Sequence, residues 1–513
     1  MIRDLNHLED QQWDVLIVGG GATGLGAAVD AASRGYKTLL LEQHDFAKGT
    51  SSRSTKLIHG GLRYLQQGNI GLVTEALHER GLLCQNAPHL VYHLPFLVPL
   101  YHWWEGPFYG IGLKVYDLLA GKLGIEPSRT LTRRQTLQAI PTVERKGLRG
   151  GAVYYDGQFD DARLAITLAQ TAVDHGACVL NYMHVTSLLK KNNMIHGVRA
   201  TDLETGDHYN LKAKVVINAT GVFADHLRRV DNKKSPLLLE PSQGIHLVLP
   251  AEFLPRDTAL LVPHTDDKRV IFMVPWHGKV LIGTTDIPVK HPTLEPKPHQ
   301  DEIDFLLQHA ARYLSKRPRR EDILSVYAGL RPLVRAKGKA TSEISRDHTI
   351  LTSKSGLITI AGGKWTTYRK MAEDVINRAI TVGGLPSRSC MTPHLHLHGY
   401  EEGLDPHDHW TLYGSNGKAI KKLMRGKKKL SEQISPHLPY ANAEVIWAVR
   451  HEMARSVEDV LARRTRTLLL DAKAAIDAAP HVAHLMAREL KKSLTWETDQ
   501  VRLFKLLAKN YLP

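Results

Sequence analysis

The feature that most constrains this chain is a glycine-rich stretch near its N-terminus. An apolar run rich in β-branched residues, residues 14–18, is followed at once by Gly19, Gly21 and Gly24 in the pattern G-x-G-x-x-G. Small residues then space a helix, which Gly35 ends before a second apolar run begins. This order predicts a strand, a tight turn, a helix and a second strand, the βαβ unit of a Rossmann-like domain.

Glu42 stands at the end of the second predicted strand. A carboxylate about 20 residues beyond such glycines can bind a ribose hydroxyl. The bare backbone at Gly19 and Gly21 lets a pyrophosphate approach the helix N-terminus. Because all these parts occur in order, we predict a dinucleotide site here rather than a glycine turn with a purely structural role.

The composition is that of an ordinary enzyme with a surplus of positive charge. The chain has 513 residues, 43% of them hydrophobic, which is enough for two or three domains. Three widely spaced cysteines indicate a reducing compartment without a disulfide framework. The N-terminus resembles no targeting peptide, and no apolar run has the length of a spanning helix. The net charge of +15 suits nucleic acid, an anionic membrane surface or an acidic substrate, and charge alone does not choose among them.

A second polar stretch, residues 50–65, has the sequence TSSRSTKLIHGGLRYL. Its hydroxyl and glycine residues interleave with Lys56, His59 and Arg63. Such a pattern suits a second cradle for the phosphates of a cofactor, and it equally suits a capped, solvated loop at the start of a helix.

With these two stretches the chain resembles a known family, the FAD-dependent glycerol-3-phosphate dehydrogenases of the aerobic, quinone-reducing type. The resembling blocks keep the family's order from residue 13 to about 466: VGGGATGLGAAVDAASRG, TSSRSTKLIHGGLRYLQQG, FDDARL, NATG, PWHGKVLIGTTD, YAGLRPL, AGGKWTTYRKMAED and HEMARSVEDVLARRTR. KLIHGGLRYL is the most specific of these, because many unrelated oxidoreductases share the Rossmann glycines.

The resemblance implies an α/β fold: a Rossmann-like FAD-binding domain, an antiparallel-sheet substrate domain and a helical C-terminal cap domain. Short alternating runs such as HLVLP and KVLIGTTD also indicate an antiparallel sheet by themselves. We expect the FAD-binding domain at residues 1–75, 151–235 and 341–385, the substrate domain at 76–150 and 236–340, and the cap domain at 386–513.

FAD is favoured over NAD because a second buried strand, residues 215–219, ends in Thr220 and Gly221 and would return the backbone to the cofactor. Near residue 364 a glycine turn precedes a helix, whose positive N-terminus would stabilise the charge of a reduced flavin. The residues that the resemblance assigns to the cofactor are Gly19, Gly21, Gly24, Glu42, Thr50, Ser51, Ser52, Lys56, Gly60, Gly61, Val185, Thr220, Gly221, Gly362, Gly363, Lys364 and Thr366.

The reaction that the resemblance implies is the oxidation of sn-glycerol 3-phosphate to dihydroxyacetone phosphate. The hydroxyl proton goes to a base, and the C2 hydrogen leaves as hydride to flavin N5. His59 and His246 are both open candidates for the base. The remaining catalytic and substrate-binding candidates are Arg63, Tyr64, Thr284, Arg331 and Lys364.

One departure concerns the residues before His246. Where relatives carry lysine, glycine and a small residue, this chain has Gln243, Gly244 and Ile245. One cation is therefore missing from the expected grip on the phosphate.

Two further features bear on partners. Residues 90–124 are rich in aromatic residues and broken by prolines. We expect Trp103, Trp104, Phe108 and Tyr109 to form a core under the substrate domain, with a lip inserted at a membrane interface as the alternative. A basic cluster is expected to be a solvated face, with anionic headgroups as a sensible partner. This cluster consists of Lys418, Lys421, Lys422, Arg425, Lys427, Lys428 and Lys429.

We therefore expect a peripheral protein on the inner, cytoplasmic face of the cytoplasmic membrane, with ubiquinone or menaquinone as the electron acceptor. A homodimer is left open. Nucleic acid is set aside because no binding module accompanies the charge. No metal is expected, because His394, His396 and His398 alternate along a connecting strand without a further ligand nearby.

Three alternatives stay open. An oxidase would give the electrons to oxygen and produce hydrogen peroxide. An FAD-dependent amine or 2-hydroxy-acid oxidoreductase would keep the fold, with a carboxylate in place of the phosphate against Arg331. A flavin-free scaffold would bind membranes through its basic C-terminal domain.

Overall fold

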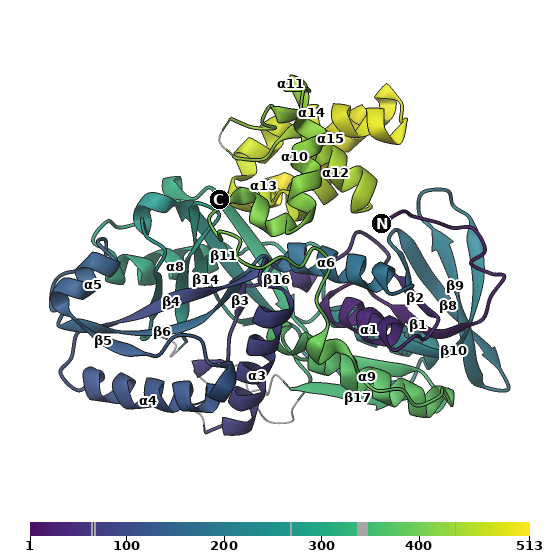
Figure 1. Cartoon of the computed structure of the whole chain (residues 1–513), viewed down its shortest axis with the longest axis horizontal. Coiled ribbons are helices and arrows are strands. Elements are labelled where there is room, and N and C mark those ends of the chain that lie inside the picture. The colour runs from purple at the N-terminus through teal and green to yellow at the C-terminus, as the bar shows by residue number, and fades with distance from the viewer. Residues whose placement is uncertain (63–64, 66–67, 267–268, 336–346, 437) are drawn as a thin grey trace.

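Two large β-sheets and a set of C-terminal helices make up the chain (Figure 1). The computed structural model describes residues 1–62, 65, 68–266, 269–335, 347–436 and 438–513. The two sheets lie on either side of the long helices α3 and α6, and the C-terminal helices cover the upper side in the view of Figure 1.

The first sheet is built around the glycine-rich stretch. Its central strand β1 pairs in parallel with β2 on one side and with β10 on the other, in the order β17-β18-β10-β1-β2-β7. The strands are β1 (Trp13–Val18), β2 (Thr38–Leu41), β7 (Cys178–Leu180), β8 (Met183–Lys191), β9 (Met194–Asp202), β10 (His208–Asn218), β17 (His348–Thr352) and β18 (Ile358–Gly362). The predicted strand, turn, helix and strand are therefore present in this order.

Helices α1 (Ala22–Ser33), α6 (Asp161–Asp174) and α9 (Tyr368–Gly383) pack together against this sheet. Small side chains allow the close approach: Ala27, Ala28 and Ala31 have no exposed surface. The N-terminus of α6 is capped, because the carboxylate of Asp160 accepts a hydrogen bond from the N–H of Arg163 at 2.9 Å.

The second sheet is mostly antiparallel, in the order β15-β11-β14-β13-β12-β4-β6-β3, with β16 beside β11 and β5 beside β6. Its strands are β3 (Leu57–Ile58), β4 (Val91–Leu100), β5 (Arg129–Thr132), β6 (Gly150–Phe159), β11 (Ser242–Pro250), β12 (Ala259–Val262), β13 (Ile271–Trp276), β14 (Lys279–Gly283), β15 (Ile287–Pro288) and β16 (Ser325–Arg331). Its helices are α3 (Ile70–Asn86), α4 (Glu105–Ala120), α5 (Arg133–Ala139) and α8 (Gln300–Tyr313).

Strand β6 differs from the expected domain boundary at residue 151. It pairs with β4 along its whole length, so residues 150–159 lie in the second sheet and not with the glycine-rich domain. The run GGAVYYDGQF contains aromatic and β-branched residues that suit a strand in either sheet, and only its pairing with β4 decides between them.

Helix α4 and the residues just before it also differ from expectation, because three of their aromatic side chains are exposed. Trp103 is 76% exposed, Phe108 52% and Leu118 79%, whereas Tyr109 is buried. The exposed apolar side chains of the helix, Phe108, Ile111, Val115 and Leu118, follow a helical spacing and so share one face. The expectation of a core was thus wrong for Trp103, Trp104 and Phe108, because Tyr109, Leu113 and Tyr116 form the packed face instead.

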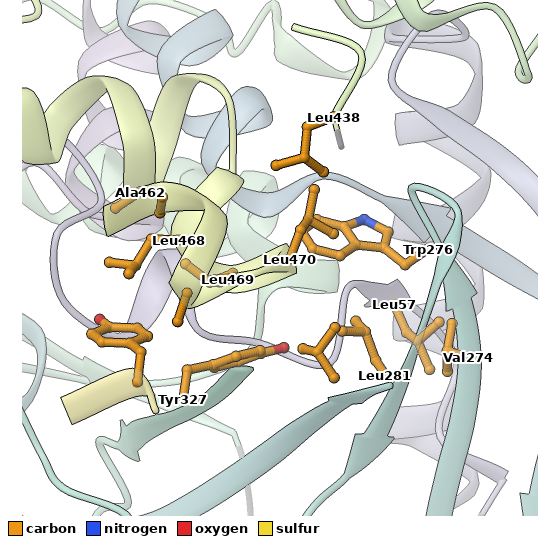
Figure 2. Packing of buried hydrophobic residues seen from close by; sticks show 14 of the residues in the cluster. Leu57, Val274, Trp276, Leu281, Tyr327, Leu438, Ala462, Leu468, Leu469 and Leu470 are labelled. Atoms are coloured by element: carbon orange, nitrogen blue, oxygen red, sulfur yellow. The ribbon is translucent and has the colours of Figure 1, made fainter. Parts of the chain in front are cut away.

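The C-terminal helices form the expected helical unit. They are α10 (Asn416–Met424), α11 (Lys428–Ser431), α12 (Asn442–His451), a π-helical turn (Asp459–Arg464), α13 (Thr467–Leu470), α14 (Ala472–Leu490) and α15 (Leu494–Ala508). Figure 2 shows how the unit docks on the second sheet: Leu468, Leu469 and Leu470 of α13 lie among Trp276, Leu281 and Tyr327 of the strands.

Buried ion pairs fix the C-terminal helical unit, the cap domain, to the part of the chain that carries the first sheet. Arg464 forms two hydrogen bonds with the carboxylate of Asp45, at 2.8 and 2.9 Å, and Arg466 bonds Asp161 at 2.8 Å. Glu458 accepts hydrogen bonds from Lys48 at 2.6 Å and from Arg463 at 2.8 Å. The pairs of Arg464 with Asp45, Arg466 with Asp161 and Glu458 with Lys48 join residues more than 300 positions apart in sequence, so the cap domain is part of the folded core.

We expect Glu458→Gln to destabilise the protein by about 2 kcal/mol at pH 7, because Lys48 and Arg463 lose a largely buried partner. Burial opposes ionisation, but these cations lower the pKa of Glu458 from 4.5 to about 2. The stabilisation is therefore complete above about pH 4.5 and is lost as the pH falls toward 2. Thermal unfolding should show a difference from wild type that narrows below pH 4.5.

The matched control is Glu252→Gln, which removes an ion pair with Lys316 whose two side chains are more than half exposed. That change should alter stability by less than about 0.5 kcal/mol. Equal effects of the two substitutions would contradict the role given to Glu458.

Candidate active site

A cavity of about 680 Å³ opens where the two sheets meet. The carboxyl ends of β1, β2, β10 and β18 contribute Gly19, Glu42, Thr220 and Gly362 to its wall, and strands β11 and β16 of the second sheet contribute His246 and Arg331. Ligands of open α/β sheets bind beyond the carboxyl ends of the strands, so the cavity lies where the fold predicts a site.

The glycines at the start of α1 allow a backbone approach that no other residue would permit. A Cβ atom on Gly24 would stand 1.9 Å from the carbonyl oxygen of Gly19, and one on Gly19 would stand 2.5 Å from that of Ala219. Gly19 also has φ of +114°, which L-residues with side chains rarely adopt. Gly21, at the N-cap of α1, has no side chain, and the hydroxyl of Ser51 accepts a hydrogen bond from the N–H of Ala22 at 2.9 Å. The first turn of α1 borders the cavity and contains no acidic residue, so the helix N-terminus can receive an anion.

Glu42 lies at the end of β2 beside this turn. Its carboxylate accepts hydrogen bonds from the N–H groups of Gly20 at 2.6 Å and His44 at 2.8 Å. Burial raises the pKa of Glu42, and the two N–H groups oppose that rise. A carboxylate held by one donor on each oxygen keeps lone pairs for a ribose hydroxyl at the cavity wall.

The far end of the cavity is formed by the turn after β18. Gly362 and Gly363 have φ of +80° and +81°, and Lys364 precedes the short helix Trp365–Thr367 that leads into α9. The hydroxyl of Thr366 accepts a hydrogen bond from the N–H of His59 at 3.1 Å. Thus a glycine cradle, a ribose-binding carboxylate and a second glycine turn line one cavity, and these residues fit FAD.

The structure brings most of the expected residues to the cavity and leaves others behind it. Those that line the cavity are Gly19, Gly21, Glu42, Thr50, Ser51, His59, Val185, Thr220, Gly221, His246, Thr284, Arg331, Gly362, Gly363, Lys364 and Thr366. Those that do not line it are Gly24, Ser52, Lys56, Gly60 and Gly61. Arg63 and Tyr64 lie outside the described residues.

Lys56 is the clearest departure from the expected phosphate cradle. Its side chain is fully buried, and its Nζ donates hydrogen bonds to Asp161 at 2.6 Å and to the carbonyl of Ser52 at 2.8 Å. Burial lowers the pKa of Lys56 to about 7. The backbone at Lys56 is left-handed, with φ of +65°, and the side chain points toward Asp161 while Thr55 and Leu57 line the cavity.

The two histidine candidates have different surroundings. His246 is 3% exposed, its ring stacks on Tyr327 at 4.9 Å between centroids, and its Nε2 lies 2.9 Å from the hydroxyl of Thr55. Burial, together with the charges of Lys56 and Arg331, holds the pKa of His246 well below 6.5. His59 also lines the cavity and is half-buried, and its backbone N–H and carbonyl both form hydrogen bonds with the hydroxyl of Thr366.

Arg331 ends β16 with its guanidinium group bound by the segment after β14. Its Nη2 donates hydrogen bonds to the hydroxyl of Thr284 at 3.0 Å and to the carbonyl of Thr285 at 2.9 Å. Its Nη1 lies 3.3 Å from a carboxylate oxygen of Asp286. Thr55, Thr285 and Asp286 could not be singled out within their sequence blocks, because their contacts depend on strands that pair only in the folded protein.

Gln243, the residue at the departure noted in the sequence, does not line the cavity. Its side-chain amide is 4% exposed and donates hydrogen bonds to Glu302 at 2.8 Å and to the carbonyl of Lys297 at 3.0 Å. The side chain at position 243 points toward α8 and not into the cavity. The substitution of glutamine for lysine there therefore takes no cation from the cavity wall.

Among the described residues, no cluster of three or more His, Cys, Asp or Glu side chains has the arrangement of a metal site. His398 is bound on both ring nitrogens, by Asp174 at 2.6 Å and by Asn416 at 2.8 Å. Among the residues that the structure describes, no helix is both long enough and apolar enough to cross a bilayer.

Comparison with known proteins agrees with the fold and the cavity. The sequence pattern of the FAD-dependent oxidoreductase family matches residues 14–369, and that of the C-terminal domain of alpha-glycerophosphate oxidase matches residues 354–499. The chain is therefore an FAD-dependent oxidoreductase, and FAD is its cofactor.

Curated relatives narrow this class. The mitochondrial glycerol-3-phosphate dehydrogenase of Mesocricetus auratus is 43% identical over 93% of this chain and 71% of its own length. The mitochondrial glycerol-3-phosphate dehydrogenase of Arabidopsis thaliana is 40% identical over 97% of this chain and 86% of its own length. The chain belongs to the family of FAD-dependent glycerol-3-phosphate dehydrogenases, as its sequence blocks indicated.

Solved structures confirm the predicted fold class. The structure of glycerol-3-phosphate dehydrogenase from Bacillus halodurans complexed with FAD has a TM-score of 0.81 and 31% identity, and the match covers 99% of this chain and 97% of that one. The L-α-glycerophosphate oxidase of Mycoplasma pneumoniae has a TM-score of 0.58 and 20% identity, over 74% of this chain and 96% of that one, and shows a shared fold alone.

Proposed function

We propose that the protein oxidises sn-glycerol 3-phosphate to dihydroxyacetone phosphate with FAD and passes the electrons to a membrane quinone. The observation that carries this proposal is a single cavity in which the dinucleotide cradle at Gly19 and Glu42 is continuous with a cationic pocket at Arg331 and Lys364. A cofactor and an anionic substrate can therefore meet in one enclosed space.

Bound FAD would supply a hydride acceptor at N5. In this proposal the N-terminus of α1 and the backbone at Gly19 and Gly21 hold its pyrophosphate, and Glu42 holds its ribose. The turn at Gly362 and Gly363 holds the flavin end. The glycine geometry and a first helical turn without an acidic residue support this placement.

The substrate's phosphate needs several cationic or hydroxyl donors. Arg331 and Thr284 lie side by side on the wall of the cavity, and Lys364 lines the same cavity. These three residues can supply the donors, since a guanidinium group binds a phosphate through two N–H groups. Arg63 and Tyr64 remain expected partners from the sequence. In an amine or hydroxy-acid oxidoreductase, Arg331 would meet a carboxylate instead.

His59 is the better candidate for the base that removes the hydroxyl proton. A base must accept a proton readily at the working pH, and the depressed pKa of His246 makes that residue a weak acceptor. The Nε2 of His246 is also occupied by Thr55. His246 would then line the substrate pocket as an uncharged imidazole.

For the membrane partner we propose that the exposed face of α4 dips into the bilayer interface. Trp103, Phe108 and Leu118 present a row of apolar and aromatic side chains to solvent, as interfacial helices do. The basic cluster on α10 and α11 lies at the opposite end of the molecule from α4 (Figure 1), and one flat membrane cannot contact both. A location on the inner face of the cytoplasmic membrane follows from a quinone acceptor and a cytoplasmic substrate.

The proposed reaction predicts that sn-glycerol 3-phosphate bleaches the visible flavin band of the purified protein under anaerobic conditions. A quinone analogue should restore the band much faster than oxygen does. Faster recovery with oxygen, with hydrogen peroxide formed, would identify an oxidase. Reduction by an amino acid or a hydroxy acid, without reduction by the phosphate ester, would overturn the substrate assignment.

For the base, we expect His59→Gln to lower kcat by about 10²- to 10⁴-fold and His246→Gln by less than about tenfold. Because the base must be unprotonated, kcat/KM of the wild type falls as the pH drops below the pKa of that base. This acidic limb should persist in His246→Gln and disappear in His59→Gln. A limb lost only in His246→Gln would reverse the assignment.

For the membrane surface, we expect a variant with Trp103→Ser, Phe108→Ser and Leu118→Ser to bind phosphatidylglycerol-containing vesicles at least about tenfold more weakly. Each large apolar side chain that leaves water contributes on the order of 1.5 kcal/mol. Reduction of the flavin by substrate should stay unchanged. The control replaces three exposed leucines of α15, Leu494, Leu503 and Leu506, and should bind as wild type; weaker binding of this control instead would place the membrane at the cap domain.

A further inference from the structure

Glu302 in the first turn of α8 is a buried carboxylate that lies behind the substrate pocket. It is 2% exposed. Its Oε1 accepts a hydrogen bond from the hydroxyl of Thr285 at 2.5 Å, and its Oε2 accepts from the amide of Gln243 at 2.8 Å and from the N–H of His299 at 3.1 Å. No cation among the described residues forms an ion pair with Glu302, which is therefore held by neutral donors alone.

Burying a carboxylate without a counter-ion costs folding free energy, so a role for Glu302 has to be sought in the groups that it contacts. Thr285 provides one. Its hydroxyl donates to Glu302 and accepts a hydrogen bond from the N–H of Ile245 at 2.9 Å, which fixes Thr285 between α8 and β11. Hydrogen bonds to an ionised acceptor are stronger than neutral ones, and Glu302 therefore holds Thr285 firmly.

Thr285 in turn holds Arg331. Its carbonyl oxygen accepts a hydrogen bond from Nη2 of Arg331 at 2.9 Å, and the hydroxyl of the neighbouring Thr284 accepts from the same nitrogen at 3.0 Å. The direction of the guanidinium plane therefore depends on where the backbone of Thr285 lies. Glu302 and Gln243 set that position from outside the cavity.

We propose that Glu302 is a positioning residue for substrate binding, acting through Thr285 to orient Arg331 toward the anionic group of the substrate. The inference rests on the proposed function for the identity of that group. Gln243 takes part by donating to the second oxygen of Glu302, so the residue that departs from the family's lysine belongs to this support and not to the phosphate grip.

Glu302 also accepts the N–H of His299 at the start of α8, and a purely structural role as a helix cap has to be separated from positioning. Thr285→Val separates them, because it removes the hydroxyl that links Glu302 to the pocket and leaves the helix cap intact. Thr285→Ser keeps that hydroxyl and is the matched control. Glu302→Gln tests the charge itself.

In the FAD-loaded protein, we expect Thr285→Val and Glu302→Gln to raise KM for sn-glycerol 3-phosphate at least fivefold, with a smaller change in kcat, and Thr285→Ser to stay within twofold of wild type. In an Arg331→Lys background, the same two substitutions should raise KM by less than twofold, because the group that they orient is gone. An equal rise in both backgrounds, or a loss of thermal stability with KM unchanged in either variant, would overturn the proposal.

The same series separates this proposal from the proposed function. If wild-type flavin is not reduced by sn-glycerol 3-phosphate, the substrate assignment fails. The positioning role is then tested by the affinity for inorganic phosphate, measured from the flavin absorbance, with Thr285→Val and Thr285→Ser compared in the same way. Equal phosphate affinity of these two variants would overturn the role of Glu302 whatever the substrate is.

Discussion

The contact between Gly24 and Gly19 is the constraint on which the rest of this structure depends. The first turn of α1 lies so close to the end of β1 that a Cβ atom on Gly24 would stand 1.9 Å from the carbonyl oxygen of Gly19. This approach directs the helix N-terminus into the cavity and places Glu42 of the next strand beside it. The turn proposed to hold the pyrophosphate is therefore a property of backbone packing, and Glu42 adds the carboxylate proposed to bind the ribose.

The cavity wall formed by residues 50–59 depends on the cap domain, although none of the described residues of that domain lines the cavity. Burial alone would raise the pKa of Asp45, but the guanidinium groups of Arg464 and Arg463 lower it, so the pair remains ionised in the interior. Arg466 and Lys56 likewise share the carboxylate of Asp161, which begins α6. These pairs bind the cap domain to the side of residues 50–59 that faces away from the cavity. The other side of that segment lines the cavity.

The sequence was sufficient for elements whose pattern is local, and insufficient where a residue's direction depends on distant partners. The βαβ unit and the strand and glycine turn near Gly362 follow from apolar periodicity and glycine spacing. The direction of Lys56 was not predictable, because its partner Asp161 is 105 positions away. The exposure of Trp103 and Phe108 was not predictable either, because the packing of Tyr109 and Leu113 decides which face of α4 is buried.

The two cations nearest His246, Lys56 and Arg331, have different carboxylate partners, and their roles differ accordingly. Lys56 forms an ion pair with Asp161, and Arg331 lies beside Asp286. Burial in the first place, and then the charges of Lys56 and Arg331, lower the pKa of His246 and keep its imidazole neutral. A neutral ring on that wall adds no positive charge that would compete for the phosphate. The support for Arg331 from α8 comes through Thr285 rather than through an ion pair with Glu302, so the guanidinium group is oriented without a second carboxylate at its side. Orientation and charge are thus controlled by different residues around one arginine.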